Sequence, residues 1–461
     1  MQSPAGLRSR RQAIARSWDL ARAAVLIPAG LPVPIPGSDQ FHDFHAHPEF
    51  TYLAGARTPG ACLAFDPAEG WVLFAPVPSL EDRVWVGDGE DLEALAGATG
   101  LPVRPLPGLR AWLEHRRGEA LAILGNDDIT YRPAGYGIES WAALELDVDH
   151  SLSTRLGEQV AESRRSKDPS EVALMRAAAD ASRGGHLLAL RTALPGMSER
   201  QLQIELEAEF FRHGAERTAY GSIVGTGSNG AVLHFSPTAR QLRNGELVLI
   251  DAGAEWEGYA SDVTRTFPAS TRFEGIHRDL YQLVLDVQQS AIATVRPGVE
   301  YRDLHLAASA HIAAGLVDLG ILRGDPAGLV ERDAHALFFP HGLGHMLGLA
   351  THDAGGCLKG RTPSDRFGLK WLRADLPLQP GYVVTIEPGI YFIRALLTAP
   401  ARREQYRDAV DWDRVDTLLD AGGIRIEDDV LVTETGADVL SGAIPKSIPE
   451  IEALRAEAHS R

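Results

Sequence analysis

The pattern of hydrophobic and polar positions divides the chain into two parts. Between Ala61 and about residue 150, short apolar runs such as Gly70–Pro76 alternate with helical patterns, which is typical of an α/β domain. The polar stretch Ser163–Ser170 then leads into a strong helical pattern, for which we expect Ser170 to be the N-cap. The pattern therefore predicts one domain over residues 1–160 and a second over residues 161–461.

Helical composition and periodicity predict five long helices, over residues 5–24, 170–190, 198–213, 275–295 and 301–323. The stretch Ile27–Gly37 is too rich in Pro and Gly for a helix or a central strand. Two short strands are expected around the segment GTGSNG, with His234 in an apolar setting at their end. That segment lacks the Lys-Ser/Thr pair and the helix of a phosphate-binding loop.

The segment Leu247–Pro268 combines an apolar run with two carboxylates. The run ends at Asp251, a turn follows around Gly258, and the chain returns along a polar stretch with Asp262. Opposed side chains on paired strands lie close together, so the two carboxylates can converge. An Asp at the end of a buried strand is costly unless it is paired or bound to metal. A metal site and an ordinary solvated hairpin are both compatible with this segment alone.

Two further carboxylates stand in strand-like patterns. Glu387 ends an apolar run and precedes Pro388, which cannot donate to a strand ladder. Glu427 follows Arg425 by two positions, so both would lie on the same face of a strand.

The histidine-rich segment FFPHGLGHMLGLATHD contains His341, His345 and His352. His341 and His345 are four apart, but the intervening glycines make a poor helix and the Glu of the H-E-x-x-H zinc motif is absent. One histidine with four carboxylates suits a compact site for two divalent cations. This oxygen-rich set favours Mn²⁺, although Co²⁺ and Zn²⁺ stay possible. Two such ions can hold a bridging hydroxide and polarise a carbonyl, which predicts hydrolysis.

Composition narrows the class of protein. The chain has 461 residues, 44% of them hydrophobic and 23% charged, as in a folded water-soluble protein. Its net charge of −17 argues against nucleic acid as a partner. No apolar run is long enough to span a bilayer, no secretory signal is recognised, and only two cysteines are present. A cytoplasmic enzyme without membrane partners is therefore expected.

Four motifs together resemble those of the pita-bread metallopeptidases, which include methionine aminopeptidase, aminopeptidase P and prolidase. They are DAG followed by SD, PHGLGHMLGL followed by HD, TIEPGIYF, and GGIRIEDD, and the resemblance covers about residues 165–455. It implies an α+β pita-bread catalytic domain preceded by a smaller α/β creatinase-type domain, and a homodimer. It also implies that Asp251 chelates one metal and that His345 and Glu387 chelate the other, while Asp262 and Glu427 bridge them.

Within this family, prolidase is the member that we expect. The chain is long for a methionine aminopeptidase, and creatinase lacks the metal ligands. The segment Gly368–Gly381 with Arg373, and the insertion Ile393–Asp420, are similar to features of prolidases. This resemblance implies cleavage of the Xaa-Pro bond of dipeptides. The alternative is aminopeptidase P, which releases the N-terminal residue from longer Xaa-Pro peptides. A non-enzymatic peptide-binding module is disfavoured because all five candidate ligands are present.

The resemblance also assigns roles at the substrate. His234 and His352 would contact the peptide and stabilise the oxyanion, and Glu387 would carry the proton to the leaving nitrogen. Arg373 would bind the substrate carboxylate through its guanidinium fork, and Arg425 would orient the metal-binding carboxylates and line the substrate site.

The N-terminal histidines His42, His45 and His47 have no accompanying acids or cysteines at ligand spacing, so a contact loop is favoured over a metal site. In similar enzymes the partner's N-domain can close part of the active-site mouth. Our hypothesis is that these histidines influence substrate choice.

Overall fold

The computed structural model describes residues 3–125 and 147–459, which form two compact units, residues 1–164 and 165–461. Residues 126–146, the last part of the predicted α/β alternation, lie outside the described residues. Among the described residues, no helix combines the length and the apolar composition that crossing a membrane requires.

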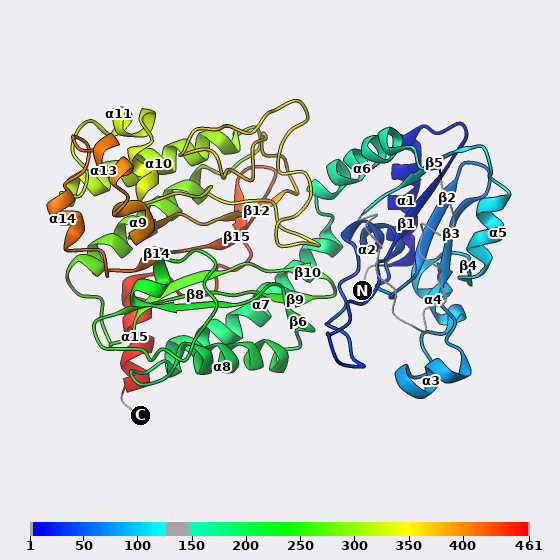
Figure 1. The fold of residues 1–461 in the computed structure, drawn as a ribbon, viewed down its shortest axis with the longest axis horizontal. Helices are drawn as coiled ribbons and strands as arrows, with labels where there is room; N and C mark the ends of the chain where they lie inside the picture. The colour runs from blue at the N-terminus through cyan, green and yellow to red at the C-terminus, as the bar shows by residue number, and fades with distance from the viewer. Residues whose placement is uncertain (1–2, 126–146, 460–461) are drawn as a thin grey trace. The chain divides into compact units, whose positions relative to one another are not determined.

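The first unit contains a five-stranded mixed sheet in the order β4-β3-β2-β1-β5 (Figure 1). β1 runs parallel to β5 and β3 runs parallel to β4, while the β1–β2 and β2–β3 pairs are antiparallel. Its elements are α1 (Pro4–Trp18), β1 (Ala23–Pro28), α2 (Pro48–Ala54), β2 (Cys62–Asp66), β3 (Gly70–Ala75), α3 (Leu80–Val86), α4 (Leu92–Thr99), β4 (Val103–Pro105), α5 (Gly108–Glu114) and β5 (Ala120–Ile123), and α6 (His150–Arg165) leads to the unit boundary.

The predicted helix over residues 5–24 is too long. α1 ends at Trp18 because Asp19 adopts a left-handed conformation, with φ of 47°. The apolar run that follows is completely buried and forms β1. Ile27 and Pro28 therefore end a central strand, and irregular chain begins only after them.

The second unit holds four small sheets, and Figure 1 shows its strands between the helix pair α7–α8 and the helix pair α9–α10. The helices are α7 (Pro169–Thr192), α8 (Glu199–Arg212), α9 (Gly275–Thr294), α10 (Tyr301–Asp318), α11 (Pro326–Glu331), α12 (Arg394–Leu397), α13 (Pro400–Gln405), α14 (Trp412–Asp416) and α15 (Ile448–His459). The strands are β6 (Arg217–Thr218), β7 (Ile223–Thr226), β8 (Leu247–Asp251), β9 (Ala254–Trp256), β10 (Tyr259–Ala260), β11 (Thr264–Pro268), β12 (Val383–Ile386), β13 (Gly389–Tyr391), β14 (Gly423–Arg425), β15 (Asp428–Val432) and β16 (Ala437–Val439).

The long helix after the unit boundary begins earlier than predicted. Asp168 is the N-cap, because its side chain accepts hydrogen bonds from the backbone N–H groups of Ser170 and Glu171. Pro169 then occupies the first turn, where its missing N–H is not needed. The prediction of Ser170 as the N-cap is therefore wrong by two residues.

The strand that carries Asp251 pairs as expected, but its partner is interrupted. β8 lies between β7 and β11, and Asp251 is opposite Thr264. Between β8 and β11 the chain forms the β9–β10 hairpin, whose turn uses positive φ at Glu257 and Gly258. Asp262 therefore lies just before β11 rather than within a strand.

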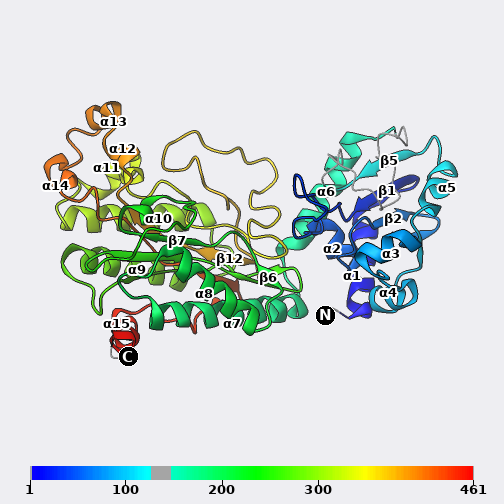
Figure 2. The same ribbon diagram turned by 60° about the horizontal axis from the view of Figure 1, so that its bottom comes forward.

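Two irregular segments of the second unit line the cavity described below. After β7 the Gly-rich segment forms the 3₁₀ helix η2 (Gly227–Ala231) instead of a turn between strands, and His234 beyond it is exposed rather than in an apolar setting. Between the 3₁₀ helix η3 (Ala334–Leu337) and β12 no helix or strand forms, and Figure 2 shows much of this stretch as an extended yellow loop.

Candidate active site

Five side chains predicted to bind metal come from five separate segments and line one cavity of about 730 Å³. Asp251 is the last residue of β8, and Glu387 directly follows β12. Asp262 lies between β10 and β11, and Glu427 lies between β14 and β15. His345 comes from the long loop before β12. Strand ends thus bring together residues that are up to 176 positions apart, from Asp251 to Glu427.

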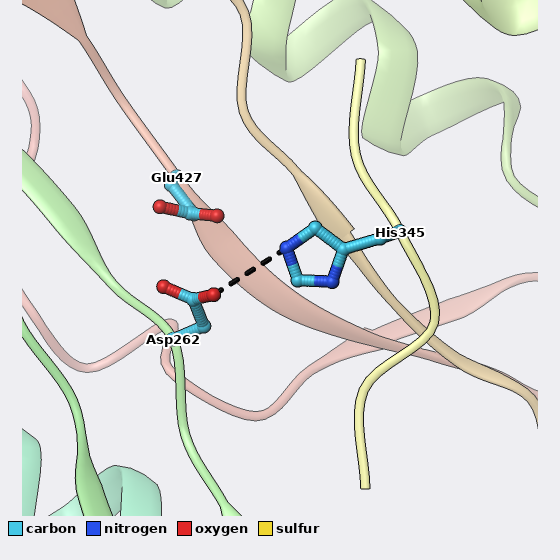
Figure 3. A group of neighbouring side chains, drawn as sticks. All are labelled: Asp262, His345 and Glu427. Atoms are coloured by element: carbon cyan, nitrogen blue, oxygen red, sulfur yellow. Dashed lines mark ion pairs between the residues drawn. The ribbon is translucent and has the colours of Figure 1, made fainter. Parts of the chain in front are cut away.

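The centre of this group is formed by Asp262, His345 and Glu427, each of which is buried (Figure 3). One ligand atom from each residue lies within 4.8 Å of the others. His345 Nε2 is 3.4 Å from Asp262 Oδ2 and 3.7 Å from Glu387 Oε1. His345 Nδ1 lies 3.0 Å from the carbonyl oxygen of Met346, to which it can donate, so Nε2 is left to face the carboxylates as a ligand atom.

The charges of the site fit divalent cations. Burial, reinforced by the neighbouring carboxylates, raises the pKa of Glu427 well above its usual range. Burial likewise raises the pKa of Glu387 to about 7. Carboxylates crowded in this way favour protonation unless a cation is present. Two divalent ions would stabilise all four carboxylates in the charged form, and the oxygen-rich donor set suits such ions.

Arg425 lines the same cavity and is buried. Its Nη2 donates to Asp251 Oδ2 at 2.6 Å, its Nε to the Thr264 hydroxyl at 3.0 Å, and its Nη1 to the Tyr391 hydroxyl at 2.7 Å. The Thr264 hydroxyl in turn donates to Glu427 Oε2 at 2.6 Å. These contacts support the predicted orienting role of Arg425 more than its predicted contact with substrate.

Sequence reasoning missed Tyr220, Thr264 and Tyr391. The Tyr220 hydroxyl lies 2.6 Å from Asp251 Oδ1 and 2.5 Å from Asp262 Oδ1, so it can donate to either carboxylate. The strand register could have indicated Thr264, since it stands opposite Asp251. Nothing in the local pattern around Tyr220 marks it.

His352 and Arg373 lie on the wall of the same cavity, as does His234. The His352 ring packs edge-on against His345, with 4.4 Å between ring centroids. Arg373 Nη1 donates to His352 Nδ1 at 3.3 Å, which leaves Nε2 to carry the proton of the neutral ring. Partial burial, followed by the charges of His345 and Arg373, lowers the pKa of His352 to about 4. The ring is therefore a neutral donor near pH 7.

His341 also lines the cavity, although no role was predicted for it. Its Nε2 lies 2.9 Å from the Tyr391 hydroxyl and its Nδ1 lies 2.7 Å from the carbonyl oxygen of Gly342. Both ring nitrogens are thus engaged with protein groups.

The N-terminal histidines lie in the first unit. His47 precedes α2, and its Nδ1 lies 3.1 Å from the carbonyl oxygen of Pro28. Within the described residues, these histidines form no group with metal-ligand geometry. Their influence on substrate choice stays a prediction.

Two family models match the chain. The model of metallopeptidase family M24 matches residues 173–434, and the model of the aminopeptidase P N-terminal domain matches residues 7–118. The chain belongs to metallopeptidase family M24. The predicted pita-bread catalytic domain and the smaller domain before it are confirmed.

Two curated relatives of this M24 metallopeptidase are named as Xaa-Pro aminopeptidases. The Xaa-Pro aminopeptidase of Escherichia coli K12 is 33% identical over 474 aligned positions, which cover 98% of each chain. A probable Xaa-Pro aminopeptidase of Fusarium vanettenii is 35% identical over 418 positions, 88% of this chain and 86% of the relative.

Solved structures agree with these relatives. The aminopeptidase PepP of Pseudomonas aeruginosa is 30% identical with a TM-score of 0.81, over 100% of this chain and 99% of that one. Zinc-substituted aminopeptidase P of E. coli in complex with product is 32% identical, also with a TM-score of 0.81, over 99% of each chain. A metal-dependent Xaa-Pro peptidase is therefore supported, while the expected prolidase specificity is not.

The insertion Ile393–Asp420, one of the features that resemble prolidases, lies outside the cavity lining. It forms the short helices α12–α14, and none of its residues lines the cavity. Tyr406 of this insertion donates to the carbonyl oxygen of Arg332, and Val410 bridges to Leu322. The insertion therefore contributes no side chain to the cavity wall.

Proposed function

We propose that this chain is a metal-dependent Xaa-Pro aminopeptidase, which removes the N-terminal residue from peptides that have proline in second place. The observation that carries the proposal is the match to the E. coli Xaa-Pro aminopeptidase at 33% identity over 98% of both chains. The gathering of all five candidate ligands around one cavity supports the metal-dependent part of the proposal.

The candidate ligands Asp251, Asp262, His345, Glu387 and Glu427 would hold two divalent cations. When bound, such ions activate water as a nucleophile and polarise the scissile carbonyl. Manganese stays a prediction from the oxygen-rich ligand set, and a homodimer stays a prediction from the resemblance. Metal analysis of purified protein and light scattering would test them.

The remaining residues would bind the peptide and move protons. The carboxylate of Glu387 would accept a proton from the attacking water and return it to the proline nitrogen. The Nε2–H of His352 would donate to the carbonyl oxygen as negative charge develops there, and His234 would bind the peptide from another part of the wall. Arg425 would keep Asp251 and Glu427 in place through its direct bond to Asp251 and through Thr264.

Prolidase activity is the second candidate, because Arg373 lies on the cavity wall where a carboxylate could meet it. This arginine is exposed, and no salt bridge to it is found within the described part of the chain. An exposed guanidinium can bind the end of a dipeptide or contact a longer peptide that continues past proline.

The substrate comparison separates the two activities. We expect kcat/KM for Ala-Pro-Ala and Arg-Pro-Pro to exceed that for Ala-Pro and Leu-Pro by about tenfold or more, the ratio that roughly 1.4 kcal/mol provides. N-acetyl-Ala-Pro-Ala is the control, since an aminopeptidase requires a free amino group. Preference for the dipeptides, lost in Arg373→Ala, would establish prolidase instead.

A further inference from the structure

Glu199, the first residue of α8, has a buried carboxylate that accepts hydrogen bonds from both ends of the loop carrying His234. Oε1 accepts from the backbone N–H of Thr226 at 3.0 Å, from the Thr226 hydroxyl at 3.0 Å and from Asn229 Nδ2 at 2.9 Å. Oε2 accepts from the backbone N–H of Thr238 at 3.2 Å and from its hydroxyl at 2.7 Å. One side chain thus joins the two ends of the loop.

The backbone of the loop between these ends makes few hydrogen bonds of its own. Residues 232–240 form no helix or strand. In the described structure, no backbone N–H of residues 233–237 donates to a backbone carbonyl. Leu233 and Phe235 pack against a small apolar cluster, and together with His234 they line the cavity. The backbone course of this wall therefore depends on the contacts at its ends.

The carboxylate of Glu199 is not needed to cap α8. Ser198 is the N-cap, and its side chain and that of Gln201 exchange hydrogen bonds with each other's backbone N–H in a capping box. A glutamate in the first turn interacts favourably with the helix dipole, but this effect does not require five donors from another segment. The five groups that donate hydrogen bonds to the Glu199 carboxylate all belong to Thr226, Asn229 and Thr238.

Arg240 adds positive charge to the same junction. Its guanidinium donates to the Thr226 hydroxyl, and its Nη2 donates to Glu246 Oε1 at 2.6 Å. The Thr226 hydroxyl accepts from Arg240 and donates to Glu199, so it links the carboxylate to a cation.

We infer that Glu199 is a positioning residue, which fixes the loop of residues 226–238 so that His234 stands at the cavity wall. The functional part of this inference rests on the proposed peptidase activity, while the clamping itself does not. Glu199 contacts the loop and lies outside the residues that line the cavity, so it would act through His234.

The sharpest variant is Glu199→Gln, which keeps the shape of the side chain. A glutamine places an NH₂ group where one of the carboxylate oxygens accepts a backbone N–H, from Thr226 in one orientation and from Thr238 in the other. Neither backbone donor can turn away, so one end of the loop loses its acceptor. Glu205→Gln, on the exposed face of the same helix, is the matched control.

Hydrogen exchange tests the clamp without any substrate. We expect the hydrogen-bonded backbone amides of Thr226, Val232 and Thr238 to exchange about tenfold faster in Glu199→Gln than in wild type, because an unpaired buried donor weakens the closed loop by about that factor. Glu205→Gln should exchange like wild type. Unchanged exchange in Glu199→Gln would overturn the inference. Should that variant not fold, Thr238→Val removes one donor from the loop side, leaves α8 intact and provides the same readout.

A double-mutant cycle tests the link to His234. We expect Glu199→Gln to lower kcat about tenfold in the wild-type background but less than about twofold when His234→Ala is already present, since coupled residues are not additive. If kcat of the double variant instead falls by the product of the two single-variant factors, Glu199 does not act through His234. A wild-type protein that cleaves no Xaa-Pro peptide would contradict the proposed function, and the exchange experiment would still decide the clamp.

Discussion

Arg425 Nη2 lies 2.6 Å from Asp251 Oδ2, at the floor of a cavity where four carboxylates meet. The side chains are 4% and 13% exposed, so this ion pair is shielded from water and salt. Arg425 also donates to the hydroxyls of Thr264 and Tyr391, which fixes the plane of its guanidinium. The arginine therefore holds a candidate metal ligand in place at the cavity wall.

Replacing Arg425 with lysine should disturb the site while it keeps the charge. A lysine has one ammonium group and cannot reproduce three directed hydrogen bonds. We expect metal affinity and kcat to fall about 10–100-fold, as is usual when a residue that orients metal ligands is lost. Isothermal titration with Mn²⁺ and steady-state kinetics would measure the two effects. The matched control is Arg394→Lys, because Arg394 pairs with Asp420 at 2.7 Å on the surface. Wild-type affinity and kcat in Arg425→Lys would contradict this assignment.

Thr264→Val tests the hydroxyl that links Arg425 to Glu427. Valine has nearly the same shape, but it neither donates to Glu427 Oε2 nor accepts from Arg425 Nε. We expect a loss of about 1–3 kcal/mol in unfolding free energy from the unpaired buried groups, with weaker metal binding. Thr266→Val on the same strand is the comparison, since the Thr266 hydroxyl contacts only the backbone of Arg425. Equal metal affinity in the two variants would exclude a special role for Thr264.

Tyr220→Phe removes the phenol between Asp251 and Asp262. Burial and then the charges of these two carboxylates raise the pKa of Tyr220, so the hydroxyl stays protonated and donates. Without it, the two aspartates lose a shared donor, and we expect kcat to fall about tenfold through misplaced ligands. Tyr281→Phe, which removes a hydroxyl bonded to the carbonyl oxygen of Lys446 at 2.7 Å, is a control outside the cavity. An unchanged kcat in Tyr220→Phe would show that this contact is dispensable.

Buried histidines predict a loss of stability in acid. Burial lowers the pKa of His186, His305 and His335 to about 4 each, below their unfolded value of 6.5. Between these two values the three rings bind more protons in the unfolded chain than in the folded one, so these histidines lower the stability as the pH drops from about 6.5 to about 4. Each such histidine contributes a slope of about 1.4 kcal/mol per pH unit at most.

Urea unfolding of metal-free protein at several pH values would measure this slope. His305→Leu should lower this slope by at most the contribution of one proton, about 1.4 kcal/mol per pH unit, because the other histidines remain. A difference in unfolding free energy between wild type and His305→Leu that stays constant from pH 7 to pH 4.5 would contradict the assignment of the His305 ring as buried and neutral.

The sequence predicted the chemistry of the site better than its geometry. Asp251, Glu387 and Glu427 were recognisable because carboxylates beside apolar strands are costly without a partner. Asp262 was expected within a strand, but the β9–β10 hairpin places it just before β11. Tyr220 could not be recognised, because its contacts with two aspartates arise only from the folded arrangement.

Substrate specificity was harder to predict for a related reason. Arg373 lies in a segment that resembles one of prolidases. Its side chain is exposed beside His352, and the resemblance of the segment does not show which group of the substrate this side chain binds. Glu199 likewise looks like an ordinary first-turn glutamate, and only the tertiary structure shows its five donors. The candidate ligand types follow from local pattern and the fold from the resemblance of the motifs, whereas the shape of the cavity depends on loops whose ends meet in space.

The central claim, a metal-dependent aminopeptidase, is tested most directly by adding Mn²⁺ to chelator-treated protein and identifying the products from Ala-Pro-Ala by mass spectrometry. The account predicts free Ala and Pro-Ala in equal amounts, formed only after metal is restored. An intact tripeptide in the presence of metal, with Ala-Pro cleaved under the same conditions, would contradict it in favour of a dipeptidase. Undiminished cleavage after chelation would contradict the metal site itself.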